Sequence, residues 1–558
     1  MKPIAPVAAA AVLLAATPAL AEEAPRSDRP EVLHNGIRLP ANWPPRIDKL
    51  TREPMPVPYL QRPPEVIPID VGRQLFVDDF LVERTTLKRA YHLAEYHPHN
   101  PVVTYDRPWE KEGRAPFAAV FSDGVWYDPA DKLFKMWYLG GYLKSTCRAT
   151  SRDGVRWDKP ALDVEKGTNV TMRHHRDSST VWLDHAEKDP KRRYKMFTTT
   201  SRDGWRLALH GSPDGVHWSK PLAVSPKIGD RTTVFYNPFR KVWVWSLRIG
   251  ASGVGRARAY REHADAAAGM KWGKDDTVPW LCADKLDPHH PKFPAVAPQL
   301  YNFDAVAYES VMLGLFAIHQ GPPNRQCAQR HIQKRNEILL GFSRDGFHFH
   351  RPDRRRFIGV TETDGDWNWG NVQSAGGGCL VVGDKLYFYV SGRFRSDEFW
   401  DGRGSTGLAV LRRDGFASMD AGGASGVLTT RPVRFRGKYL FVNVDADEGE
   451  LRVEVLDPAG KVLAGFARDR CVPIRADGTL QRVTWRGGGE IGRLAGRAVR
   501  FRFHLRKGSL YAFWVSPDAS GASHGYVAAG GPGYTGPTDT VGAAALRAAG
   551  PRSRKRGT

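Results

Sequence analysis

The chain has 558 residues, enough for two domains, and its 25% charged and 41% hydrophobic residues are typical of a folded globular protein. The formal net charge of +22 would suit a nucleic-acid partner, but the arginines are dispersed and no nucleic-acid-binding motif is present, so we expect no such function. Five cysteines without CxxC spacing argue against a disulfide scaffold and a zinc site, and we expect one bridge at most.

Residues 1–21 are predicted to be a secretory signal peptide. Lys2 precedes an apolar run over 7–16, and the small-residue sequence Ala-Leu-Ala at 19–21 precedes two glutamates, which indicates cleavage after Ala21. The run is too short to span a bilayer and is followed by Pro18, and no other segment is long and apolar enough. We therefore expect a periplasmic or secreted protein without a membrane span.

A repeated pattern follows along the chain. Short aromatic and β-branched segments, such as LFKMWYLGGY at 133–142 and KLYFYVSGR at 385–393, lie between turn signals and predict strands. Several units end in Asp-Gly followed by an aromatic, as in RDGVRW (152–157) and PDGVHW (213–218), and Asp-Gly suits a tight turn between a third and a fourth strand. Repeats of about sixty residues predict a β-propeller, and five units fit between 97 and 420.

The segments on either side of the repeats have a different character. Residues 22–96 are predicted to be an N-terminal extension with an entry strand. Residues 427–535 alternate apolar and polar positions between short turns, which predicts a β-sandwich accessory domain. Residues 536–558 end in a basic tail that we expect to be disordered. The predicted fold class is all-β, with a five-bladed propeller followed by a C-terminal β-sandwich.

Chemistry in a propeller is expected where the innermost strands of the blades present side chains at one axial end. The first four predicted innermost strands carry acids, and the fifth carries amides instead. The candidates in chain order are Asp123, Asp177, Asp230 with Arg231, Asp304 with Glu309, and Asn371.

Five blades with an Asp in the first, an Asp in the third and a Glu in the fourth resemble the invertase, levansucrase and arabinanase superfamily of glycoside hydrolases. The segments LFVDDFLVE (75–83), HPHNPVV (97–103) and GKYLFVN (437–443) resemble a group of exported bacterial proteins described as invertase-like glycoside hydrolases. The superfamily's NDPNG, RDP and EC motifs are echoed by SDGVWYD (122–128), GDRTTVFYNP (229–238) and YES (308–310).

The resemblance implies an exported enzyme that cleaves glycosidic bonds of an oligo- or polysaccharide with paired carboxylates. It assigns Asp123 as base or nucleophile, Asp230 as the carboxylate that tunes the acid's pKa, and Glu309 as general acid. Reserve acids and expected substrate contacts are Asp177, Asp304, Arg231, Trp367, Trp369 and Asn371.

Each assignment has a structural alternative. Asp123 would be a turn residue, Asp230 an ion-pair partner of Arg231, and Glu309 an edge acid, while the tryptophans would pack within blades. A non-catalytic glycan-binding propeller and a glycoside phosphorylase are the alternative functions. The expected partner is a carbohydrate, with an anionic polymer as one form, and no cofactor is expected unless a structural Ca²⁺ lies on the axis.

Overall fold

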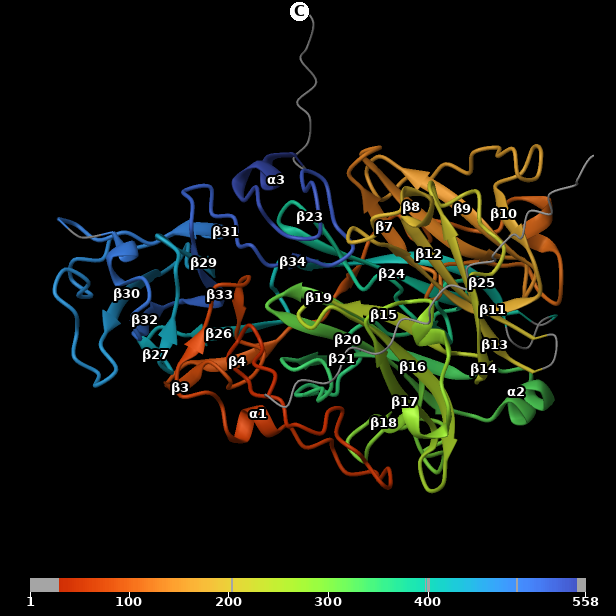
Figure 1. The fold of residues 1–558 in the computed structure, drawn as a ribbon, viewed down its shortest axis with the longest axis horizontal. Coiled ribbons are helices and arrows are strands. Elements are labelled where there is room, and N and C mark those ends of the chain that lie inside the picture. Colours follow the sequence, from red (N-terminus) through yellow and green to blue (C-terminus); the bar gives the residue numbers. More distant parts are fainter. Residues whose placement is uncertain (1–29, 202–203, 397, 399–401, 488–489, 549–558) are drawn as a thin grey trace, which may run out of the picture.

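The computed structural model describes residues 30–201, 204–396, 398, 402–487 and 490–548, and in these ranges the chain is built from strands (Figure 1). The described helices are short: α1 (Pro58–Gln61), α2 (Asn324–Arg330) and α3 (Ala543–Ala548). None of them has the length and apolar character needed to cross a membrane. The prediction of an all-β fold is confirmed, whereas the predicted signal peptide lies outside the described residues.

Five sheets in the described part of the chain follow one another along the sequence. The first contains β6 (Ala118–Ala119), β7 (Val125–Asp128), β8 (Leu133–Gly140), β9 (Ser145–Ser151) and β10 (Val170–Arg173). The second contains β11 (Arg176–Leu183), β12 (Tyr194–Thr200), β13 (Arg206–Ser212) and β14 (Ala223–Lys227). The third contains β15 (Thr233–Asn237), β16 (Val242–Ala251), β17 (Gly255–His263) and β18 (Val278–Cys282).

The fourth and fifth sheets each include a strand from a distant part of the chain. The fourth contains β19 (Gln299–Glu309), β20 (Val311–Gly321), β21 (Arg335–Ser343) and the C-terminal β34 (Tyr526–Val527). The fifth contains β22 (Asn371–Gln373), β23 (Leu380–Val382), β24 (Lys385–Phe394), β25 (Arg403–Arg412) and the N-terminal β5 (Glu95–Tyr96). Sheet contacts run from β7 to β11, β11 to β15, β15 to β19, β21 to β22 and β25 to β6, which closes the five described sheets into a ring.

The Asp-Gly turns are structural, as the sequence predicted. Asp153 Oδ1 accepts the backbone N–H groups of Val155 and Arg156, both at 2.8 Å, directly after strand β9. Asp214 and Asp345 accept the equivalent N–H groups after β13 and β21. An Asp side chain thus fixes the same turn in three sheets.

These turns also join neighbouring sheets. In each case an aromatic side chain of the preceding sheet donates a hydrogen bond to a backbone carbonyl of the turn. The three pairs are Tyr389 Oη to Gly154 O at 2.6 Å, Trp137 Nε1 to Gly215 O at 2.7 Å, and Trp280 Nε1 to Phe347 O at 2.9 Å.

Two further sheets form the sandwich, which lies beside the ring in Figure 1. One has the order β31 (Asp477–Arg482), β29 (Tyr439–Asp445), β33 (Gly508–Ser516), β26 (Ala417–Ala421), β4 (Lys88–Tyr91), with β2 (Gln74–Leu75) paired to β33. The other has the order β3 (Val82–Thr85), β27 (Gly426–Thr430), β32 (Arg500–Arg506), β30 (Glu450–Leu456). A short parallel pair joins β1 (Ile67–Pro68) to β28 (Val433–Arg434).

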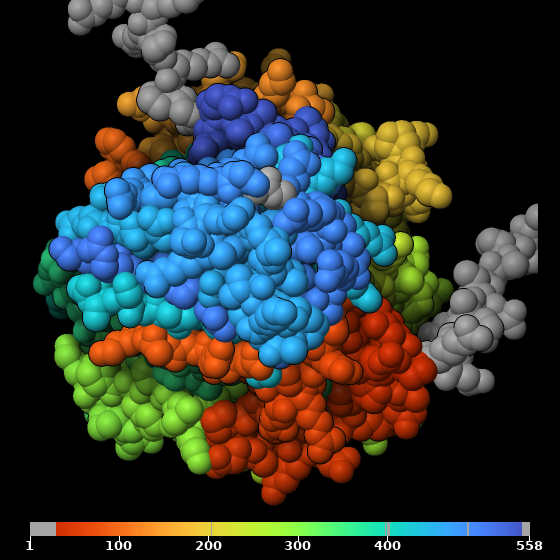
Figure 2. Space-filling model, turned by 90° about the vertical axis from the view of Figure 1, so that its left-hand side faces the viewer, coloured from red at the N-terminus to blue at the C-terminus, as the bar shows by residue number. Residues whose placement is uncertain are grey.

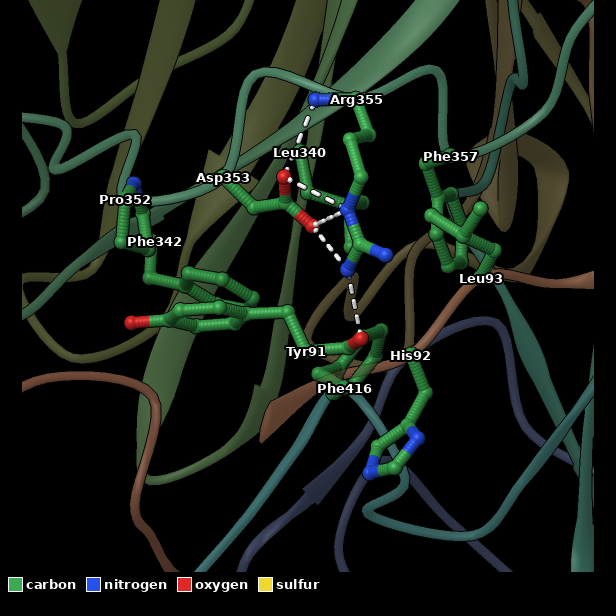
Figure 3. A pocket seen from close by; sticks show the side chains of 10 residues that line it. All are labelled: Tyr91, His92, Leu93, Leu340, Phe342, Pro352, Asp353, Arg355, Phe357 and Phe416. Carbon is green, nitrogen blue, oxygen red and sulfur yellow. Dashed lines mark hydrogen bonds and ion pairs between the residues drawn. The ribbon is translucent and has the colours of Figure 1, made fainter. Parts of the chain in front are cut away.

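The sandwich therefore includes three strands from the segment predicted to be an extension. Figure 2 shows this N-terminal part, in red and orange, along the lower edge of the blue sandwich face. The N-terminal segment also contacts the connection between β21 and β22, as Figure 3 shows. There Arg355 Nη2 donates to Tyr91 O of β4 at 2.6 Å and pairs with Asp353 at 2.7 Å. The cavity there is about 10 Å³, room for about one water, so it is a packing defect and not a ligand site.

The prediction of a disordered tail from 536 onward is wrong for the part that the structure describes. Asp539 is fully buried, its Oδ1 accepts Gly542 N at 2.8 Å, and Ala545 of α3 is buried as well. A charged composition predicts disorder only where nothing packs on the segment, and here the chain returns to the ring through β34. Residues 549–558 lie outside the described ranges.

Candidate active site

Side chains at the starts of the innermost strands meet in one polar cluster. Arg231 of the third sheet lies over the ring of Phe121 of the first at 4.3 Å, and Asn302 of the fourth sheet donates to Ser122 Oγ of the first at 3.0 Å. Sheets that are not neighbours in a ring touch only near its centre, so these contacts locate the axis. We call Asp123, Arg176, Asp177, Arg231, Asn302 and Asp304 the axial cluster.

Asp123, the predicted base or nucleophile, is in the cluster but has no exposed surface. Arg176 of β11 binds both of its oxygens, with Nη2 at 3.1 Å from Oδ2, and also donates to Ser179 Oγ at 2.6 Å. Burial raises the pKa of Asp123, and the Arg176 guanidinium opposes that shift. Because both carboxylate oxygens are engaged, Asp123 is suited to holding Arg176 in place.

Asp177 is more accessible. Its Oδ1 lies 2.9 Å from Arg231 Nε, and its side chain is 10% exposed. Burial raises the pKa of Asp177 and the charge of Asp230 raises it further, whereas Arg231 lowers it. Asp230 itself is 35% exposed, 3.6 Å from Arg248, at the edge of the cluster.

Asp304 lies on β19 and accepts hydrogen bonds from its own strand and from the segment that follows β22 in the fifth sheet. Its Oδ2 accepts Asn302 Nδ2 at 2.7 Å and the backbone N–H of Ala375 at 3.1 Å. Burial raises the pKa of Asp304 from 3.8 to about 6, against the hydrogen bond from Ser122 and these two donors. A carboxyl group with that pKa carries a proton in a substantial fraction of molecules just below neutral pH.

Several buried polar atoms around Asp304 have no hydrogen-bond partner within the described residues. Buried polar groups are nearly always paired in native proteins, so such a concentration indicates a place for solvent or a polar ligand. The atoms are Asn302 Oδ1, Asn371 Nδ2, Gln373 Oε1 and Nε2, Ser374 Oγ and Arg231 Nη1.

Three cations surround Tyr301 in the same region. Its hydroxyl accepts Lys334 Nζ at 3.0 Å, and the guanidinium of Arg256 lies 4.9 Å from its ring centre, with Arg231 at 5.5 Å. Burial would raise the pKa of this phenol, but the three cations outweigh burial and lower it. The region around Tyr301 therefore favours negative charge.

Glu309, the predicted general acid, does not lie in the axial cluster. Glu309 is fully buried at the far end of β19, where Oε1 lies 3.0 Å from Arg413 Nη2 and Oε2 accepts Arg73 N at 3.0 Å and Ser523 Oγ at 2.7 Å. Five residues of strand separate it from Asp304, about 17 Å. Glu309 is thus part of an ion-pair network between the ring and the sandwich.

Of the two tryptophans expected to contact substrate, Trp367 is too buried to do so. Trp367 is 7% exposed, and a Cβ atom on Gly392 or Gly407 would come within 2.3 Å or 2.1 Å of its ring, so it packs inside the fifth sheet. Trp369 is half-buried, with Arg395 5.6 Å from its ring, and it precedes β22 by two residues. Asn371 begins β22 and is fully buried beside Asn336.

In the described ranges no group of three or more His, Cys, Asp or Glu side chains is placed to hold a metal ion. The site residues that the sequence analysis missed are Arg176, Tyr301 and Asn302. Arg176 could have been found, because it directly precedes the candidate Asp177 at a strand start, as Asp230 precedes Arg231.

No protein-family model matches the chain, and no curated protein matches it. Among solved structures, a thermostable family-43 glycoside hydrolase is 11% identical, with 57% of this chain and 96% of that chain covered and a TM-score of 0.38. A family-43 arabinoxylan arabinofuranohydrolase from Bacillus subtilis is 10% identical, with coverages of 75% and 97% and a TM-score of 0.34. A glycosyl hydrolase from Bacteroides ovatus is 14% identical, with coverages of 62% and 97% and a TM-score of 0.38. Likeness at this level carries no functional argument.

Proposed function

We propose that the chain is an exported glycoside hydrolase that cleaves an oligo- or polysaccharide at the axial cluster. The observation that carries the proposal is the meeting of acids from three sheets with unpaired buried amides at the centre of the ring. Glycosidic cleavage needs one carboxylic acid and one carboxylate on opposite sides of the bond, and hydrogen-bonding groups for the sugar hydroxyls.

Asp304 takes the role of general acid in this proposal, in place of Glu309. A general acid works best when its pKa lies near the working pH, and burial brings the pKa of Asp304 to about 6. Asn302 and Ala375 hold one carboxyl oxygen, which orients the other. The proton on Asp304 would pass to the oxygen of the leaving sugar.

Asp177 takes the role of base or nucleophile. Its Oδ1 lies 2.9 Å from Arg231 Nε, but within the described residues it accepts no hydrogen bond, so it is available to a donor such as water or a sugar hydroxyl. Asp123 acts through Arg176 as a positioning residue, and Asp230 acts on Asp177 through its charge. Arg231, Asn371 and Trp369 are the proposed substrate contacts, and the cations around Tyr301 would suit an anionic sugar.

The test is hydrolysis by the purified protein on a panel of furanoside and pyranoside polysaccharides, with reducing ends as the readout. Asp304→Asn and Asp177→Asn should each lower turnover at least a hundredfold without unfolding the protein, because an amide keeps the shape but transfers no proton. Asp163→Asn is the matched control, since its side chain is 78% exposed and remote from the cluster.

Retention of turnover in Asp304→Asn would refute the assignment. If no polysaccharide is cleaved but one binds, the alternative of a non-catalytic glycan-binding propeller is correct. Export is a separate proposal, and it predicts that the expressed protein is recovered outside the cytoplasm with Glu22 as its first residue.

A further inference from the structure

A second cavity lies at the opposite ends of the strands that carry the axial cluster. It has a volume of about 260 Å³ and is lined from the first four sheets by Trp126, Trp182, Tyr236 and Ala307, with Tyr526 of β34 closing one side. On β11, Asp177 and Trp182 are five residues apart, about 17 Å, and on β19 Asp304 and Ala307 are three residues apart, about 10 Å. The cavity shares no lining residue with the axial cluster, so it is distinct from the candidate active site.

The walls of this cavity are aromatic. The rings of Trp126 and Trp182 lie 4.6 Å apart and tilted by 59°, and Trp182 is 8% exposed. Tyr236 and Tyr526 are half-buried beside them. Aromatic faces carry partial negative charge and attract the C–H groups of a saturated ring.

The rim is polar. Lys241 and His185 are exposed at the mouth. Asp184 also lines the cavity, and its carboxylate lies 2.7 Å from Lys195 Nζ. Trp126 Nε1 donates to Val181 O at 2.9 Å, whereas the hydroxyl of Tyr236 and Nε1 of Trp182 form no hydrogen bond with the described residues. A few polar groups around an apolar wall are typical of a small-molecule site, and the volume suits a single ring.

The cavity opens into a polar groove of about 560 Å³ that runs over the second and third sheets. The two share Asp184, Ala186 and Tyr236. The charged residues of the groove are mixed in sign, four acids with three bases: Asp184, Glu187, Asp189, Asp265, Lys188, Arg192 and Lys195. A groove without excess charge of either sign favours a neutral ligand that presents hydroxyl groups.

We propose that this cavity and groove form a second glycan-binding site, in which the terminal ring of a neutral pyranoside chain lies between Trp182 and Tyr236 and the next residues follow the groove. Pyranosides with equatorial hydroxyls present C–H groups to an aromatic wall and hydroxyls to a polar rim, which matches both parts. The ligand class rests on the proposed function, but binding here does not require turnover at the axial cluster.

The test is calorimetry with cellohexaose and xylohexaose in the Asp304→Asn background, where neither is consumed. At least one of the two should bind, and Tyr236→Ala should weaken that binding at least tenfold. Trp182→Ala should do the same, but Trp182 is nearly buried, so Tyr236→Ala is the decisive variant. Trp272→Ala, which changes a half-buried aromatic in the connection between β17 and β18 outside the cavity, is the control and should have no effect.

Equal affinity of Tyr236→Ala and its parent, or binding of neither sugar, would overturn the proposal. The same holds if hexagalacturonate binds to this cavity as tightly as the neutral chains. Turnover of the Tyr236→Ala protein with Asp304 intact should persist on short substrates, so failure of this site and failure of the catalytic assignment give different results.

Discussion

Replacing Asp304 by Asn should stabilise the protein at high pH while removing its activity. The buried carboxyl has a pKa of about 6 when folded and 3.8 as a model group, a difference of about two units. One unit corresponds to about 1.4 kcal/mol, so ionised Asp304 costs the folded state about 3 kcal/mol. This cost is fully present above pH 6, and it disappears as the pH falls from 6 toward 4, because the folded state then binds the proton that the unfolded state still lacks.

The amide fits the same contacts. Asn Oδ1 can accept from Asn302 and from the backbone of Ala375, and its amide group can donate to Ser122, whose hydroxyl can turn to accept. The free energy of unfolding of Asp304→Asn should thus exceed that of the wild type by up to about 3 kcal/mol at pH 8 and match it near pH 4.

Urea unfolding at both pH values measures this difference, and comparing variant with wild type at each pH cancels the other titrating groups. Asp163→Asn, with an exposed carboxylate, should show no stabilisation at pH 8. A variant that is less stable than the wild type at pH 8, or equally shifted at both pH values, would refute the argument that burial dominates at Asp304.

Three further changes test other parts of the structure. Gly215→Ala should lower the free energy of unfolding, measured in urea, by at least about 2 kcal/mol, because φ at this residue is +76° and the new Cβ would lie 2.3 Å from the Trp137 ring. An unchanged urea midpoint would contradict the role of this turn in joining the first and second sheets. Glu309→Gln should destabilise the protein by about 2–3 kcal/mol in the same assay, since it removes one of the two carboxylates, Glu309 and Asp539, that pair with the buried Arg413. Turnover per folded molecule should be unchanged, whereas a catalytic Glu309 would lose it. Trp369→Ala should raise KM severalfold with little change in kcat, and steady-state kinetics that show the reverse would remove it from the substrate path.

A structural feature could be predicted from the sequence when its contacts join residues close together in the chain, and was missed when they join distant ones. The Asp-Gly turns were predictable because Asp153 bonds its own neighbours two and three residues on. Glu309 was chosen over Asp304 because β19 is 11 residues long and the sequence does not reveal which part of this strand lies in the axial cluster. The N-terminal strands of the sandwich were missed for a similar reason, since β3 pairs with a strand more than 300 residues away, at Leu428.

The Arg176–Asp177 dipeptide carries a signal that a propeller prediction could use. Consecutive residues of a strand point to opposite faces of the sheet, and in a ring these two faces meet different neighbouring sheets. Arg176 accordingly binds Asp123 of the first sheet while Asp177 pairs with Arg231 of the third. An adjacent basic and acidic pair at the start of an innermost strand can therefore link three sheets, and the strand that carries it has one charged side chain toward each neighbour. Such a pair fixes the relative height of the three strands, because a shift of one residue would turn each charge toward the wrong sheet.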